Sequence, residues 1–140
     1  MPLMTWTAAL SVGHPEMDRQ HKNLMDLVND LHDRMLSGQA NAALADVLDR
    51  LVQYTQSHFA AEERLLARAG YPGLASQRAE HQALTQQVVK FRDECRNGRV
   101  ALSVHVSRFL KDWLQTHIVG EDKKYTAYVS AQAKPVAAAV

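Results

Sequence analysis

The chain has 140 residues, with 16 basic and 15 acidic side chains and a formal net charge of +1. This length suits one domain whose core needs no disulfide support, and the even mixture of charges argues against nucleic acid as a partner. No apolar stretch reaches the roughly 20 residues that span a membrane, and the N-terminus lacks a secretory signal. The single cysteine, Cys95, fits a reducing compartment, so we expect a cytoplasmic protein.

Apolar residues recur at spacings of three and four along most of the chain, which is typical of amphipathic helices. Residues 1–17 contain Pro2, Gly13 and Pro15 and are predicted to form an irregular lead-in. Glycines follow the four long periodic segments and mark their ends. Helices are predicted over residues 18–36, 41–69, 77–96 and 106–119, with a short fifth piece over 122–132.

Four long amphipathic helices joined by loops of a few residues predict an all-α fold, an antiparallel up-down-up-down four-helix bundle. No segment shows the alternating pattern of a strand. The predicted domain covers residues 1–132. The alanine-rich end, residues 133–140, is predicted to be frayed.

Each predicted helix carries a polar residue on its apolar stripe, where an unpaired carboxylate is costly. The full set is His21, His58, Glu62, Gln77, His81, His117 and Asp122. Any one of them alone is more often a hydrogen-bonded core residue than a ligand. The alternating directions of the helices, however, bring all seven to one end of the bundle. A metal there would accept the imidazole lone pairs and cancel the carboxylate charge.

The donor set narrows the choice of metal. Four imidazoles and two carboxylates are too many ligands for one tetrahedral zinc ion, and calcium and magnesium prefer oxygen. The mixture suits iron among other transition metals, with two carboxylates able to bridge two ions. The chain has no Glu-x-x-His motif of the ferritin-like di-iron enzymes. A histidine-rich site holds less negative charge and favours the ferrous state, which points towards reversible oxygen binding.

Four segments resemble the hemerythrin family, in particular the single-domain bacterial hemerythrins: DRQHKNL (18–24), HFAAEE (58–63), YPGLASQRAEH (71–81) and WLQTHIVGED (113–122). The similarity includes Trp6 and Gly13 and extends over roughly residues 4–128. It agrees in residue type, spacing and order. The resemblance implies a four-helix bundle with an oxo- or hydroxo-bridged non-haem di-iron site that binds dioxygen reversibly.

The resemblance also implies a role for each matching position. The bridging ligands are Glu62 and Asp122. Two histidines serve each iron, His21 and His58 the oxygen-binding iron and His81 and His117 the other. Five apolar residues, which are equally consistent with ordinary core packing, would line the oxygen pocket: Leu24, Phe59, Trp113, Leu114 and Ile118.

Gln77 departs from the family pattern, which has a third histidine for the second iron four residues before His81. Four interpretations stay open: the amide oxygen binds iron, a water fills the position, the site is mononuclear, or the residue is an engineered substitution. The first two predict a labile or open second iron, handling of oxygen or peroxide at both irons, and faster autoxidation. The other histidines, His14, His32 and His105, are predicted to lie at the surface or rim.

Three functions are compatible with this reading. The leading one is an oxygen-binding carrier, store or sensor, although the chain shows no signalling domain. The rival is an iron redox enzyme that uses the position opened by Gln77 to reduce peroxide or nitric oxide. A third is a metal-storage or structural bundle, which predicts no optical change with oxygen.

Overall fold

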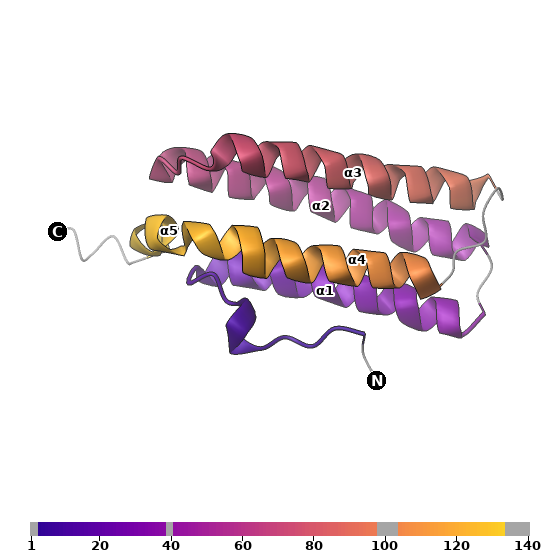
Figure 1. Cartoon of the computed structure of the whole chain (residues 1–140). Helices are drawn as coiled ribbons and strands as arrows, with labels where there is room; N and C mark the ends of the chain where they lie inside the picture. The colour runs from indigo at the N-terminus through magenta and orange to yellow at the C-terminus, as the bar shows by residue number, and fades with distance from the viewer. Residues whose placement is uncertain (1–2, 39–40, 98–103, 134–140) are drawn as a thin grey trace.

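The computed structural model describes residues 3–38, 41–97 and 104–133, except for the side chains of residues 41–42, 104–107 and 130–133. Four long helices follow one another: α1 (Pro15–Leu36), α2 (Asn41–Ala69), α3 (Leu74–Arg96) and α4 (Val104–Thr116). They run alternately in opposite directions, and the described residues contain no strand (Figure 1). The predicted all-α, antiparallel four-helix bundle is therefore confirmed.

The helices pair along their lengths, α2 with α3 and α1 with α4, and the two pairs meet where α1 packs on α2 (Figure 1). Leucines and valines on their facing stripes form the core, with Leu31, Leu48 and Leu66 fully buried. The turn between α2 and α3, the start of α1 and the end of α4 lie at the same end of the bundle. Polar residues near those helix ends are thereby brought together.

The lead-in ends earlier than predicted, because α1 begins at Pro15 rather than Asp18. Proline is well suited to the first helical position, where its missing N–H needs no partner. His14 caps this helix, since its Nδ1 accepts a hydrogen bond from the Met17 N–H at 3.2 Å. The lead-in contains one 3₁₀ turn, η1 (Ala8–Leu10), and is attached to α1 where the Asp18 carboxylate accepts a hydrogen bond from the Val12 N–H at 2.9 Å.

The end of α4 is not a simple helix stop. A π-helical turn, η2 (His117–Glu121), is followed by a 3₁₀ turn, η3 (Asp122–Tyr125), and then by helix α5 (Thr126–Ala133). Gly120 lies inside the π turn and does not end the segment, contrary to the prediction. The fifth piece predicted for 122–132 corresponds to η3 together with α5.

Some predictions fall outside the described part of the chain. The frayed tail, apart from Ala133 at the end of α5, lies in residues 134–140, and the side chain of His105 is also outside it. His32 is partly buried on α1. Among the described residues, no helix combines the length and apolar character needed to cross a membrane.

Candidate metal centre

The structure brings the seven predicted polar residues together at one end of the bundle. None of them exposes more than 4% of its surface, although all seven are polar or charged. The contributions come from α1 (His21), α2 (His58 and Glu62), α3 (Gln77 and His81) and the segment that follows α4 (His117 and Asp122). Burying so many polar groups in one place is costly unless each finds a partner.

The Glu62 carboxylate lies at the middle of this cluster. The Nε2 atoms of His21 and His58 lie 3.3 and 3.5 Å from its Oε2, and Nε2 of His81 lies 3.0 Å from its Oε1. The Tyr125 hydroxyl donates a hydrogen bond to Oε2 at 2.7 Å. One carboxylate thus faces imidazoles from three different helices.

Asp122 is the second carboxylate of the cluster. Its Oδ2 lies 3.2 Å from Nε2 of His21, and its Oδ1 lies 3.0 Å from Nε2 of His117. Two sets of donor atoms are close enough to hold a metal: His21, His58 and Glu62 form one, and Glu62, His81, His117 and Asp122 form the other. Glu62 belongs to both sets, and Asp122 also reaches His21 of the first.

The π turn explains how His117 and Asp122 reach the same place. Side chains five residues apart point about 140° apart around a regular α-helix. In the π turn the Asp122 N–H bonds to the carbonyl oxygen of His117, five residues earlier. This extra residue in the turn brings the two side chains onto one side. Single π turns within helices occur frequently at functional sites.

The outer ring nitrogens of three histidines also have partners. Nδ1 of His81 lies 3.0 Å from Oε2 of Glu63, and Nδ1 of His117 lies 3.2 Å from Oε2 of Glu80. Nδ1 of His58 lies 2.6 Å from the side-chain oxygen of Gln20. A partner at Nδ1 fixes the ring so that Nε2 faces the centre, the arrangement typical of metal-ligating histidines.

The two carboxylates draw positive charge into the centre. Burial opposes a charge on His21, but its hydrogen bonds to Asp122 and Glu62 outweigh burial and raise its pKa to about 10. Burial lowers the pKa of His58 to about 4. Although burial acts against the ionised form of Glu62, hydrogen bonds from His21 and His81 hold its pKa well below the usual value. Without a metal, a proton on an imidazole supplies the positive charge that Glu62 requires.

Gln77 is buried within the centre and lies against the second donor set. Its Nε2 donates a hydrogen bond to Oδ1 of Asp122 at 3.0 Å. Its Oε1 is buried and has no hydrogen-bond partner among the described residues. The amide hydrogens therefore face the carboxylate, and the oxygen, the only atom of this side chain that can ligate a metal, is unpaired.

The donor set fits a transition-metal centre. Imidazole nitrogens and carboxylate oxygens are the ligands that iron accepts in proteins. Six side chains that carry them, from α1, α2, α3 and the segment after α4, converge in a buried space. A metal would replace the proton on His21 and compensate both carboxylates. The unpaired Gln77 oxygen is consistent with a further polar partner at the same place.

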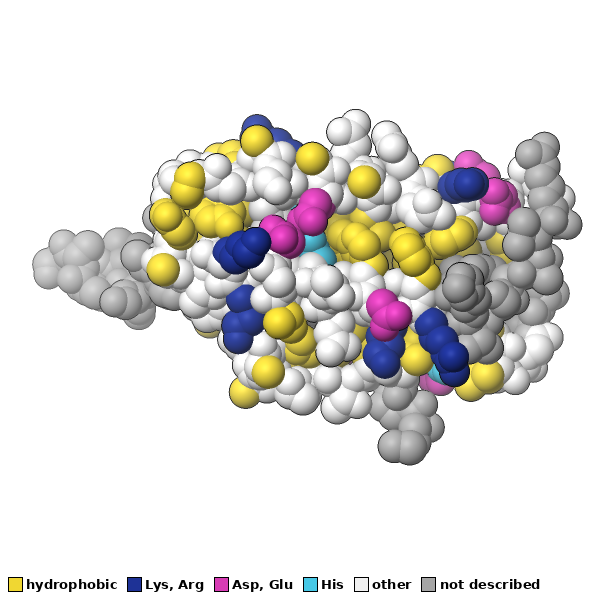
Figure 2. All heavy atoms as spheres, in the orientation of Figure 1, with side chains coloured by type: hydrophobic (Ala, Val, Ile, Leu, Met, Phe, Trp, Pro, Cys, Tyr) yellow, Lys and Arg dark blue, Asp and Glu magenta, His cyan; other side chains and the backbone are white. Residues whose placement is uncertain are grey.

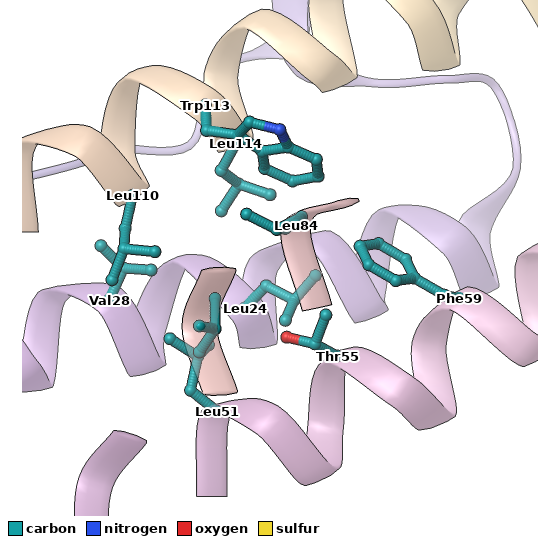
Figure 3. A pocket seen from close by; sticks show the side chains of 10 residues that line it. Leu24, Val28, Leu51, Thr55, Phe59, Leu84, Leu110, Trp113 and Leu114 are labelled. Atoms are coloured by element: carbon teal, nitrogen blue, oxygen red, sulfur yellow. The ribbon is translucent and has the colours of Figure 1, made fainter. Parts of the chain in front are cut away.

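An apolar cavity of about 20 Å³ lies beside the centre, inside the bundle (Figure 3). A space of this size holds about one water-sized molecule. Four of the five predicted pocket residues line it, namely Leu24, Phe59, Trp113 and Leu114. Ile118 is fully buried but is not part of this lining. The Phe59 ring stacks on the His81 ring, with centroids 3.8 Å apart, and so connects the cavity to the centre.

The groove between α3 and α4 approaches the centre from outside. Glu80, Trp113 and His117 contribute to its walls. On this face, Figure 2 shows a histidine flanked by acidic side chains next to a row of hydrophobic ones. Trp113 stacks on His117 with centroids 4.6 Å apart, and therefore covers one face of the imidazole.

Sequence reasoning missed the side chains that surround the seven polar residues of the centre. Glu63 and Glu80 stand directly beside predicted site residues, within HFAAEE and RAEH, so their positions carried a signal. Gln20 likewise directly precedes His21 within DRQH, whereas Tyr125 lies outside the segments of the predicted site and carried no such signal.

A four-helix bundle with a buried centre of imidazoles and shared carboxylates defines the class of helical metalloproteins with two adjacent metal positions. The family model named "Hemerythrin HHE cation binding domain" matches residues 12–129. The chain belongs to the hemerythrin family, whose members bind a di-iron centre.

Curated relatives and solved structures agree with this assignment. The chain is 37% identical to a bacteriohemerythrin of Methylococcus capsulatus over 94% of this chain and 100% of that one. It is 36% identical to one of Stenotrophomonas maltophilia, covering 94% of this chain and 84% of that one. The crystal structure of a wild-type hemerythrin superposes with a TM-score of 0.86 at 35% identity, over 91% of this chain and 98% of that one.

Proposed function

We propose that this di-iron oxygen-binding protein binds and releases dioxygen intact and serves as an oxygen carrier or store. The observation that carries the proposal is the buried cluster of four imidazoles and two shared carboxylates next to an apolar cavity of about 20 Å³. A sensor would need a partner to receive the signal. The single cysteine supports our proposal of a cytoplasmic location.

We assign the metal ligands from the contacts within the cluster. His21 and His58 would hold one iron, His81 and His117 the other, and Glu62 and Asp122 would serve both. When bound, the irons supply the electrons and the coordination position that oxygen binding requires. Glu63 and Glu80 orient the imidazoles of the second pair through their Nδ1 atoms. Tyr125 holds Glu62 in place by its hydrogen bond.

The apolar side chains beside the centre have a separate role. Leu24, Leu114 and Phe59 keep bulk water out of the cavity, because their side chains offer no hydrogen-bonding group. Excluding water and free protons from this space would disfavour the release of peroxide. The cavity thus favours reversible binding over oxidation.

Gln77 supports a second candidate function. Its amide nitrogen bonds to Asp122, and the second donor set contains two imidazoles, those of His81 and His117. We propose that the second iron has one strong ligand fewer and exchanges its remaining ligand more easily. An iron centre with such a position could reduce peroxide or nitric oxide, and Gln77 is the observation that favours this alternative.

The two candidates are separated by an oxygen-release experiment. The anaerobically reduced protein is exposed to dioxygen, its optical spectrum is recorded, and the oxygen is then removed under argon. A carrier returns to the reduced spectrum with no added reductant over several cycles. Irreversible bleaching to a ferric spectrum would favour the redox enzyme, and a spectrum insensitive to oxygen would contradict both.

A further inference from the structure

Three of the four tyrosines of the chain form a continuous path from the centre to the surface. The path begins at Tyr125, which is fully buried and donates its hydroxyl hydrogen bond to Oε2 of Glu62 at 2.7 Å. Tyr125 is therefore in direct contact with the carboxylate shared by both donor sets.

Tyr71 occupies the middle of the path. Its ring meets that of Tyr125 edge-on, with centroids 6.1 Å apart and an interplanar angle of 82°. On its other side it meets Tyr128, with centroids 5.1 Å apart and an angle of 69°. Tyr71 is half-buried, and Tyr128 exposes 41% of its surface. Exposure thus rises step by step from the carboxylate to the solvent.

Gly73 leaves room for the middle ring. A Cβ atom at this position would lie only 2.6 Å from the Tyr71 ring, so a larger residue would displace it. The α2–α3 turn therefore accommodates Tyr71 where it contacts both other rings. This close approach makes the path a feature of the backbone as well as of three side chains.

We propose that Tyr125, Tyr71 and Tyr128 carry oxidising equivalents from the metal centre to the surface, which gives the protein a peroxidase activity towards small one-electron donors. The donor would be of the phenol or ascorbate class and would react at Tyr128. The inference rests on the iron centre of the proposed function. Phenol side chains in contact can pass electrons in short steps, which the aliphatic side chains of the surrounding core cannot do.

The electrons and protons balance as follows in this activity. When iron is bound, hydrogen peroxide would take up two electrons through the path and two protons from solvent, its O–O bond would break, and two waters would form. Each electron leaves Tyr125, whose phenol proton passes to Oε2 of Glu62. An electron from Tyr71, and then from Tyr128, restores Tyr125, which takes its proton back. Tyr128 releases its phenol proton to solvent when it is oxidised, and the donor returns one electron and one proton to it. One peroxide therefore consumes two donors, yields two oxidised donors, and takes from solvent as many protons as Tyr128 releases there.

A second aromatic route for electrons between the centre and the surface must be distinguished from the tyrosine path. Trp113 stacks on His117 and reaches the groove between α3 and α4. An indole can also be oxidised by one electron. The two routes give different radicals, an indolyl at Trp113 and a phenoxyl at Tyr128, so spectroscopy separates them.

The experiment treats the iron-loaded, oxidised protein with hydrogen peroxide and follows the radical by freeze-quench electron paramagnetic resonance. We expect a tyrosyl radical in the wild-type protein and, without a donor, covalent dimers joined through dityrosine. Tyr71→Phe keeps the ring but removes the oxidisable phenol, and should abolish both the Tyr128 radical and the dimers. Tyr128→Phe should abolish the dimers as well.

Tyr54→Phe is the matched control, because Tyr54 bonds to Asn23 and is not part of the path. It should keep the radical and the dimers. Iron per chain is measured in every variant, so that a loss of metal is not mistaken for a broken path. An unchanged Tyr128 radical in Tyr71→Phe, an indolyl radical, or no radical in iron-loaded wild-type protein would overturn the inference alone. A chain that retains no iron would overturn the proposed function as well.

Discussion

Glu62 depends more on its neighbours than any other side chain of the centre. It is fully buried and is surrounded by three imidazole nitrogens and one phenol. A buried carboxylate that loses its compensating partners is destabilising by several kcal/mol. The function of the centre should therefore depend on the groups that hold water away from this cluster and on those that orient its imidazoles.

Leu114→Ala tests whether the cavity protects the centre from water. The substitution enlarges the space beside the polar centre, where entering water would find hydrogen-bonding partners, so the oxygenated protein should autoxidise faster. It should also destabilise the fold by about 2–5 kcal/mol. Leu48→Ala removes an equally buried leucine that is not part of the cavity lining, and should cost similar stability at an unchanged autoxidation rate. Equal autoxidation rates in both variants would contradict the pocket assignment.

Glu63→Gln and Glu80→Gln test the carboxylates behind His81 and His117. Each substitution replaces the carboxylate next to a histidine Nδ1 by an uncharged amide. Iron retention should weaken by about 10–100-fold, which is the usual effect of losing such a partner. The measurement is the rate of iron loss to a chelator. Glu94→Gln, near the far end of α3, is the control and should retain iron like the wild type. Retention unchanged in both test variants would show that these carboxylates do not orient ligands.

The residues of the polar cluster are easier to recognise from the sequence than the residues that support them. His58 and Glu62 are one helical turn apart on an apolar stripe, and such local spacing is readable without a structure. Tyr125 and Gln20 contact residues far away in the chain, so their roles depend on how helices pack. Whether Gln77 ligates depends on the direction of one amide group, which no residue pattern encodes.

At the scale of the element, helix existence was easier to predict than helix ends. The apolar periodicity of α1 to α4 predicted all four helices. The sequence pattern predicts an interruption at Pro15, which is instead the first residue of α1, because proline both starts and breaks helices. Gly120 was interpreted as a stop for a similar reason, whereas the chain continues through a π turn.

An insertion tests whether the π turn sets the direction of Asp122. One alanine added after Val119 should rotate Asp122 and Tyr125 by about 100° relative to α4. The rotation should break the hydrogen bond from Tyr125 to Glu62 and remove Asp122 from the centre. We therefore expect the second iron to be lost, which is measured as iron per chain. An alanine added after Gly38, in the α1–α2 connection, should leave iron content unchanged. Full iron content in the first variant would contradict the assignment of Asp122 as a ligand.

At the scale of the whole molecule, the bundle and its centre depend on each other. Helices α1, α2 and α3 and the segment that follows α4 contribute donors, so a metal connects elements that are far apart in the sequence. When no metal is bound, the positive charge that faces the two buried carboxylates comes from protonated imidazoles such as that of His21. The stability of the metal-free protein should consequently depend on their protonation.

The metal-free protein should be most stable near pH 6.5, the ordinary pKa of histidine. The pKa of His21 is raised to about 10, so its contribution is complete below pH 6.5 and is lost as the pH rises towards 10. The pKa of His58 is lowered to about 4, so stability also falls as the pH drops from 6.5 towards 4. Urea unfolding of the stripped protein between pH 4 and 10 measures this curve. A midpoint that does not vary across the range would contradict the observed pairing of His21.

Iron per chain, measured together with the optical spectrum, tests the central claim most directly. The six donors other than Gln77 form two sets, so we predict two irons in the wild-type protein, a near-ultraviolet oxo-bridge band, and a visible charge-transfer band after exposure to oxygen. Gln77→His should hold the same two irons and autoxidise more slowly. One iron in the wild-type protein and two in Gln77→His would contradict the claim, because the second metal would then require the imidazole that Gln77 replaces.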